Sequence, residues 1–167
     1  MAKETKTKTT DCKKVTIKAD KIVAAYQILS TPANPQAGKA GFKLSALETK
    51  DMYIVIRAIG ALEPEAQAFE QFRKGASERL IPENWNETME KYNKFNELSE
   101  EEKTEVNKAV INYDNKVNEC VMTELDKDKE IDAYEHLSEE AFGLLVKSNG
   151  HILNDIPSLR LLREILA

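Results

Sequence analysis

The sequence contains few of the residues that carry enzymatic chemistry or covalent cross-links. Two cysteines, two histidines and one tryptophan occur among its 167 residues. Cys12 and Cys120 do not have the spacing of a zinc site or of a Cys-x-x-Cys redox motif. One lies near the N-terminus and the other in a helical pattern, which favours free thiols and a reducing compartment over a disulfide. The sequence therefore predicts a fold that needs neither a metal ion nor a cross-link.

Long hydrophobic runs are also absent. No segment reaches the roughly 18 apolar residues of a membrane-spanning helix. The first six residues, Met-Ala-Lys-Glu-Thr-Lys, lack the apolar core of a signal peptide. We therefore expect a protein without a membrane partner, located in the cytoplasm.

The candidate chemical sites fail on their spacing. His136 and His151 have no second histidine and no cysteine at a ligand spacing, so neither predicts a metal site or a catalytic triad. The acidic run 126–132 resembles a calcium loop, but an EF-hand requires Gly at its sixth position and Glu at its twelfth. Those positions hold Ile131 and Leu137. We predict no catalytic residue, no metal, no cofactor and no small-molecule substrate, and a protein that is not an enzyme.

Charge is distributed unevenly along the chain. The net charge is −5, yet residues 1–21 contain seven lysines and three acidic residues, a net of +4, which leaves −9 for the rest. An acidic body argues against a nucleic-acid surface there, because phosphate binding needs a basic patch. Residues 1–12 contain almost nothing apolar and are predicted to form a flexible tail. The lysines near this end are a candidate surface for nucleic acid or an acidic protein, or they only solubilise the chain: Lys3, Lys6, Lys8, Lys13 and Lys14.

Helical periodicity dominates the rest of the chain. We expect residues 13–167 to form one mainly α-helical domain built on a helical hairpin or bundle, with the hairpin core at 45–125. Ser45 and Glu48 have the spacing of a capping box and predict a helix start. Pro64 predicts a kink or a restart in that helix. Ser99 and Glu102 predict a second capping box, where the other side of the hairpin restarts.

The most regular apolar pattern of the chain lies in the second half of this hairpin. Its members are spaced 4, 3, 4 and 3 residues apart, which is typical of a narrow coiled-coil seam. The seam consists of Val106, Val110, Tyr113, Val117 and Cys120. It either packs within the chain against the helix at 47–61, which we favour, or faces a second copy.

Two short strands complete the prediction. Residues 15–18 alternate apolar and polar side chains, and residues 130–135 follow the long helix as a second candidate strand. Their pairing would form a minor two-stranded β element that joins the N-terminal strand to the segment after the long helix. Ser138 is expected to cap a helix, and Pro157 suits the first turn of the last one. Residues 129–167 then form a C-terminal cap on the hairpin.

The order of these elements resembles a known group of proteins. The elements are a strand and helix at 15–29, a charged hairpin, an acidic turn and strand at 124–131, and a capped helix at 137–145. This order resembles a group of small uncharacterised proteins encoded in tailed-bacteriophage and prophage genomes, over most of residues 13–147. The chain departs from that group in a longer middle section, 64–98, and in its last helix, 156–166.

The resemblance implies a phage context and carries no catalytic residues. It implies a virion or assembly component, present in the host cytoplasm or in the virion. We therefore expect a non-enzymatic protein–protein interaction or structural protein whose partners are copies of itself or other virion proteins. A nucleic-acid-associated protein that uses the basic N-terminal tail is the alternative.

Overall fold

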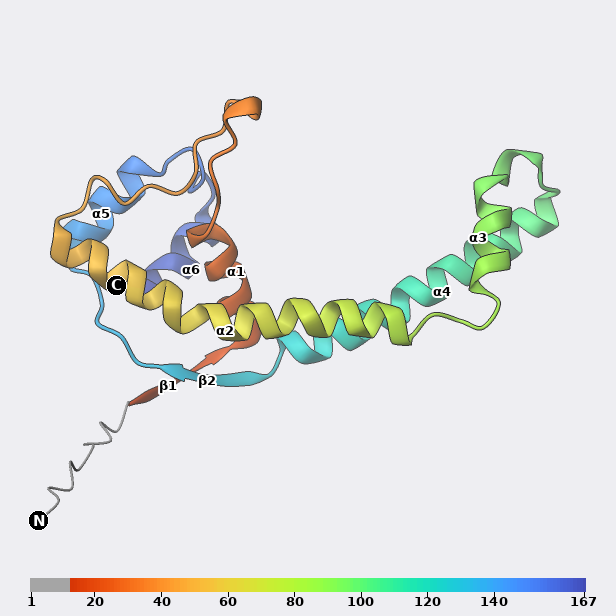
Figure 1. Ribbon diagram of the computed structural model, residues 1–167, viewed down its shortest axis with the longest axis horizontal. Helices are drawn as coiled ribbons and strands as arrows, with labels where there is room; N and C mark the ends of the chain where they lie inside the picture. Colours follow the sequence, from red (N-terminus) through yellow and green to blue (C-terminus); the bar gives the residue numbers. More distant parts are fainter. Residues whose placement is uncertain (1–12) are drawn as a thin grey trace, which may run out of the picture.

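The computed structural model describes residues 13–167, which form a rounded head and a long projecting arm of helices (Figure 1). The prediction of a mainly helical chain with a minor two-stranded sheet is confirmed. In chain order the elements are β1 (Lys14–Lys18), α1 (Ala19–Leu29), the 3-10 helix η1 (Pro35–Ala37), α2 (Thr49–Arg79), α3 (Trp85–Asn93), the 3-10 helix η2 (Phe95–Glu97), α4 (Glu100–Leu125), β2 (Asp128–Asp132), α5 (Glu139–Ser148) and α6 (Ile156–Leu166).

The main hydrophobic core lies in the head, outside most of the predicted hairpin. It joins α1, the first half of α2, β2, α5 and α6. Its fully buried side chains include Ile22 of α1, Val55 and Leu62 of α2, Leu145 of α5 and Leu162 of α6. No residue of α4 belongs to this core cluster. The segments at the two ends of the described chain therefore carry much of the core, instead of only capping a hairpin.

The two strands pair as the sequence predicts. β1 and β2 are antiparallel, with Val15 opposite Ile131 and Thr16 opposite Glu130. β2 occupies Asp128–Asp132, two residues earlier than the predicted start. Ile131 is buried against the core, whereas Thr16 and Glu130 lie on the exposed face. The two-stranded ribbon thus covers one side of the head. It joins the start of the described chain, β1, to β2, which directly follows α4.

Of the two outcomes predicted at Pro64, a kink or a restart, the restart is wrong. α2 is one helix of 31 residues that contains Pro64 in its interior. Proline removes the hydrogen bond to the carbonyl four residues earlier, which belongs to Gly60. Both residues are exposed, so this carbonyl lies on the solvent side of α2. Leu62 and Ala66, on the opposite side, are buried and hold the helix in place on both sides of the proline.

The predicted capping box at Ser45 is also wrong. α2 begins at Thr49, its N-cap is Glu48, and no side chain bonds to the free amides of its first turn. The Leu47 N–H instead donates to the Leu44 carbonyl at 3.0 Å, closing a turn that buries Leu47 in the core. Burial of Leu47 therefore overrides the local capping signal.

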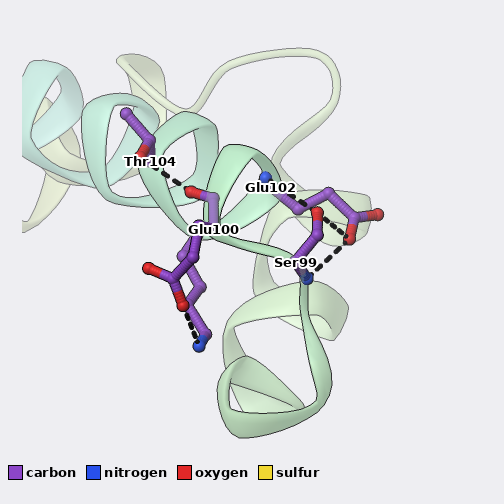
Figure 2. Close-up of polar contacts among 5 residues, drawn as sticks. Ser99, Glu100, Glu102 and Thr104 are labelled. Carbon is purple, nitrogen blue, oxygen red and sulfur yellow. Dashed lines mark hydrogen bonds and ion pairs between the residues drawn. The ribbon is translucent and has the colours of Figure 1, made fainter.

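The other capping signals are confirmed. The Ser99 hydroxyl accepts from the Glu102 N–H at 3.3 Å, and the Glu102 carboxylate accepts from the Ser99 N–H at 3.0 Å (Figure 2). The Ser99 N–H and the Ser99 hydroxyl both donate to the Glu102 carboxylate, and these two bonds lower the pKa of Glu102. Ser138 caps α5, and Pro157 lies in the first turn of α6. α4 therefore begins at a defined point near the tip of the arm.

Candidate protein-interaction surface

The projecting arm is the most unusual feature of the structure. It consists of residues 65–79 of α2 together with α3 and α4, and it extends well beyond the head (Figure 1). Of the 26 residues of α4, only Val106 is buried. A helix of a globular domain usually buries a continuous apolar stripe. Most of α4 is therefore not packed against other elements in the way that a helix of a globular domain usually is.

Two contacts position α4 in the arm. The Tyr113 hydroxyl donates a 2.8 Å hydrogen bond to the Ser77 carbonyl of α2. The ring of Tyr113 also packs on Trp85 of α3, with the ring centroids 4.5 Å apart. Ala66, Phe69 and Ala76 are the buried residues of α2 in this region. The arm is thus a thin layer of helices with a small core of its own.

The predicted seam of α4 lies mainly within the chain. Val106 is buried, and Val110, Tyr113, Val117 and Cys120 are partly buried. The predicted partner at 47–61 is wrong, because Tyr113 bonds to Ser77 and Val117 lines a groove with residues 70–77. Residues 54–58 instead pack in the core of the head. α2 runs out along the arm and α4 runs back antiparallel to it (Figure 1). α4 therefore lies beside the second half of α2 and not beside residues 47–61.

Two large apolar side chains of α4 are exposed and were not singled out from the sequence. Ile111 is 56% exposed and Met122 is 63% exposed. They are eleven residues apart, which is three helical turns, so they lie on one side of α4, facing away from α2. Ile81, between α2 and α3, and Tyr92 of α3 are also exposed. The only sequence signal for Ile111 and Met122 is that they are eleven residues apart and do not belong to the 4-3 seam.

A groove runs between α2 and α4 in the arm. It has a volume of about 600 Å³. Val117 and Val121 of α4 form its apolar wall, and Arg73 and Lys74 line the α2 side. Arg73 pairs with Glu70 of its own helix at 2.7 Å. The groove combines apolar side chains with charges at the rim, which is the composition of a protein-contact surface.

The lysines near the N-terminus are only partly described. Lys3, Lys6 and Lys8 lie outside the described residues, and Lys13 is exposed. Lys14 pairs with Asp132. The next two lysines are also paired with acids, Lys18 with Asp126 and Lys21 with Glu164. The hydrogen bond that Lys18 donates to the Asp126 carboxylate raises the pKa of Lys18. Acidic residues therefore offset much of the positive charge in the described part of this segment, and the nucleic-acid alternative stays a prediction.

The histidines bond to main-chain carbonyls. His136 Nδ1 lies 3.1 Å from the Ala167 oxygen, and His151 Nε2 lies 3.1 Å from the Ala40 oxygen. Within residues 13–167, no three His, Cys, Asp or Glu side chains are grouped so as to hold a metal ion.

A separate groove beside β1 contains Tyr134 and His136, with their rings stacked 5.9 Å apart. Burial raises the pKa of Tyr134 to about 12. The hydroxyl is therefore held neutral, which makes it a poor general base near neutral pH.

Comparison of the chain with protein-family models, with curated proteins and with solved structures gave no match. No helix in the described part of the chain is long and apolar enough to cross a membrane.

Proposed function

We propose that this chain is a non-enzymatic protein-interaction protein that acts as a structural or assembly component, and that the helical arm is its contact surface. The observation that carries the proposal is the burial of a single residue, Val106, in the whole of α4. Helices in proteins gain most of their stability from the packing of an apolar face. A 26-residue helix with so little cover is suited to packing against another protein.

The exposed apolar side chains of the arm support this assignment. Burying a side chain such as Ile111 or Met122 at an interface contributes about 1.5–3 kcal/mol. Such anchors, surrounded by polar residues, are what protein interfaces use. The polar neighbours Asn115 and Asn118 lie between them on the same side of α4.

The biological setting of the proposal is a tailed phage or prophage, and it rests on the resemblance in the order of elements. In that setting the partners are copies of this chain or other virion proteins. Mass spectrometry of purified virions, and the identity of the neighbouring genes, test the setting. The chain in the particle, or capsid, portal or tail genes next to its own, would support it. Neighbours of unrelated function and absence from the particle would contradict it.

The interaction itself is tested with tagged full-length chain purified from its native cells. A variant with Ile111→Lys and Met122→Lys changes the arm, and Leu144→Lys, at a 43% exposed position on α5, is the matched control. We expect the wild type and the control to co-purify the same protein, and the arm variant to lose it. The same co-purification with all three chains would contradict the proposal.

A further inference from the structure

We propose that the groove between α2 and α4 binds the arm of a second copy of this chain, so that two arms lie side by side as a four-helix bundle. In this arrangement α2 of each copy packs against α4 of the other. The inference rests on the proposed function, because it names one partner of the same arm. Three features of the groove support it: its apolar wall, its unpaired charges and the level at which those charges lie.

The apolar wall has the spacing of a helix-packing surface. Val110 and Val117 belong to the seam, and Val121 lies four residues after Val117, so the three follow one side of α4 that includes the edge of the seam. All three are only partly buried, whereas Val106 of the seam is buried. A second layer of helices packed on this side would cover them. Two-layer helical packing of this kind is the ordinary way in which helical hairpins form stable bundles.

Two unpaired charges of opposite sign lie at or beside the groove, one on each helix. Lys74 lines the α2 side of the groove, and Asp114 lies on α4 three residues before Val117, just outside the residues that line the groove. Both side chains are exposed. Neither of them makes an ion pair with any residue in 13–167. Among residues 13–167, one free cation thus lines the groove on α2, and one free anion lies beside the groove on α4.

The level of these two residues along the arm favours a particular symmetry. The hydrogen bond between Tyr113 and Ser77 fixes the alignment of α2 and α4. Lys74 is one turn before Ser77, and Asp114 follows Tyr113, so both lie slightly nearer the head than this bond. A two-fold axis parallel to the arm leaves the position of each residue along the arm unchanged. It places α2 of one copy opposite α4 of the other. It therefore places Lys74 of each copy opposite Asp114 of the other, twice per dimer.

The other way of stacking two arms is less favourable. A two-fold axis across the arm places α2 against α2 and α4 against α4. Near the level of the groove it brings the unpaired Lys74 close to Lys74 of the second copy. Like charges that face each other at an interface are unfavourable. The parallel arrangement avoids this contact and also pairs the two free charges.

The test is the mass of the purified full-length chain, measured by light scattering during size-exclusion chromatography over a dilution series. We expect twice the chain mass of 18.9 kDa at the higher concentrations. Lys74→Glu and Asp114→Lys should each weaken the dimer by about tenfold or more, because each turns two attractions into repulsions. The double variant Lys74→Glu/Asp114→Lys restores the pairing in reverse and should recover the dimer. Lys147→Glu, on the exposed side of α5, is the matched control and should remain a dimer.

Three outcomes would overturn the inference. One is a wild type that stays monomeric at every concentration, and the second is a dimer that neither single variant weakens. The third is a double variant that fails to recover the dimer. Circular dichroism of each variant checks that the helices are intact. A monomeric wild type would leave the proposed function standing if the arm still co-purifies a different protein, so the two failures are distinguishable.

Discussion

The side-chain amide of Asn149 pairs with the main chain of Lys43. The Lys43 N–H donates to Asn149 Oδ1 at 2.6 Å, and Asn149 Nδ2 donates to the Lys43 carbonyl at 2.8 Å. Asn149 is fully buried at the end of α5, and Lys43 lies in the connection between α1 and α2. This pair therefore fixes a long connection to the head, and α2 begins six residues later.

Replacement of Asn149 by alanine should destabilise the protein by about 1–3 kcal/mol, because it leaves the Lys43 N–H and carbonyl without their partners. Urea unfolding followed by circular dichroism measures the change. Asn154→Ala is the matched control, since Asn154 is exposed, and it should change the free energy of unfolding by less than about 0.5 kcal/mol. Equal stabilities of the two variants would show that the pair contributes little.

Gly41 in the same connection should not tolerate a side chain. A Cβ added there would lie 2.5 Å from the Ala33 nitrogen and 2.8 Å from the Thr31 oxygen, so the backbone must shift. We expect Gly41→Ala to cost about 1–3 kcal/mol. Gly60→Ala, in α2, meets nothing within 4 Å and should be neutral or stabilise by up to about 1 kcal/mol. Thermal unfolding of both variants tests the contrast, and a stabilising effect at Gly41 would refute it.

Ser99 and Ser45 give a second contrast, because they have the same sequence signal and different structures. Ser99→Ala removes a capping bond of α4 and should cost about 1 kcal/mol. Ser45→Ala should have an effect below about 0.5 kcal/mol, because Ser45 caps no helix. Hydrogen exchange in the first turns of α4 and α2 measures each effect locally. A larger loss for Ser45 would contradict the observed start of α2.

These two serines show what the sequence could and could not predict. Local signals were sufficient where the chain meets solvent, as at the box of Ser99 and Glu102. They failed where the core decides, since burial of Leu47 sets the turn before α2. Pro64 is a similar case, because Leu62 and Ala66 hold α2 together through the proline.

The arm was predicted only in part. The 4-3 spacing identified the side of α4 that lies within the chain, but not the part of α2 that it meets. That partner depends on how far α2 extends, which the proline obscured. The side of α4 that stays exposed depends on which other elements pack against the helix. The local sequence alone does not show whether such an element covers Ile111.

Tyr134 gives a prediction at alkaline pH. Its pKa is raised from 10.0 to about 12 by burial, so the folded chain keeps the phenol proton longer than the unfolded chain. This contribution to stability is complete below pH 10 and is lost as the pH rises through about 12. Tyr134→Phe should therefore reduce the loss of stability over that range. Tyr53→Phe, at a 63% exposed position, is the matched control and should leave the pH dependence unchanged. Phenolate absorbance of the folded protein, followed as the pH rises, should also show a late titration step in the wild type and in Tyr53→Phe. This step should be missing only in Tyr134→Phe.

The arm, and not the head, is proposed to contact another protein chain. The most direct measurement is site-specific photo-crosslinking in native cells, with a photoreactive amino acid at Ile111 of α4 or at Leu144 of α5. Both positions are exposed, at 56% and 43% respectively. We predict a discrete crosslinked product from position 111, to a second copy or to another protein, and none from position 144. Crosslinking from position 144 alone, or from neither position, would contradict the assignment of the arm as the contact surface.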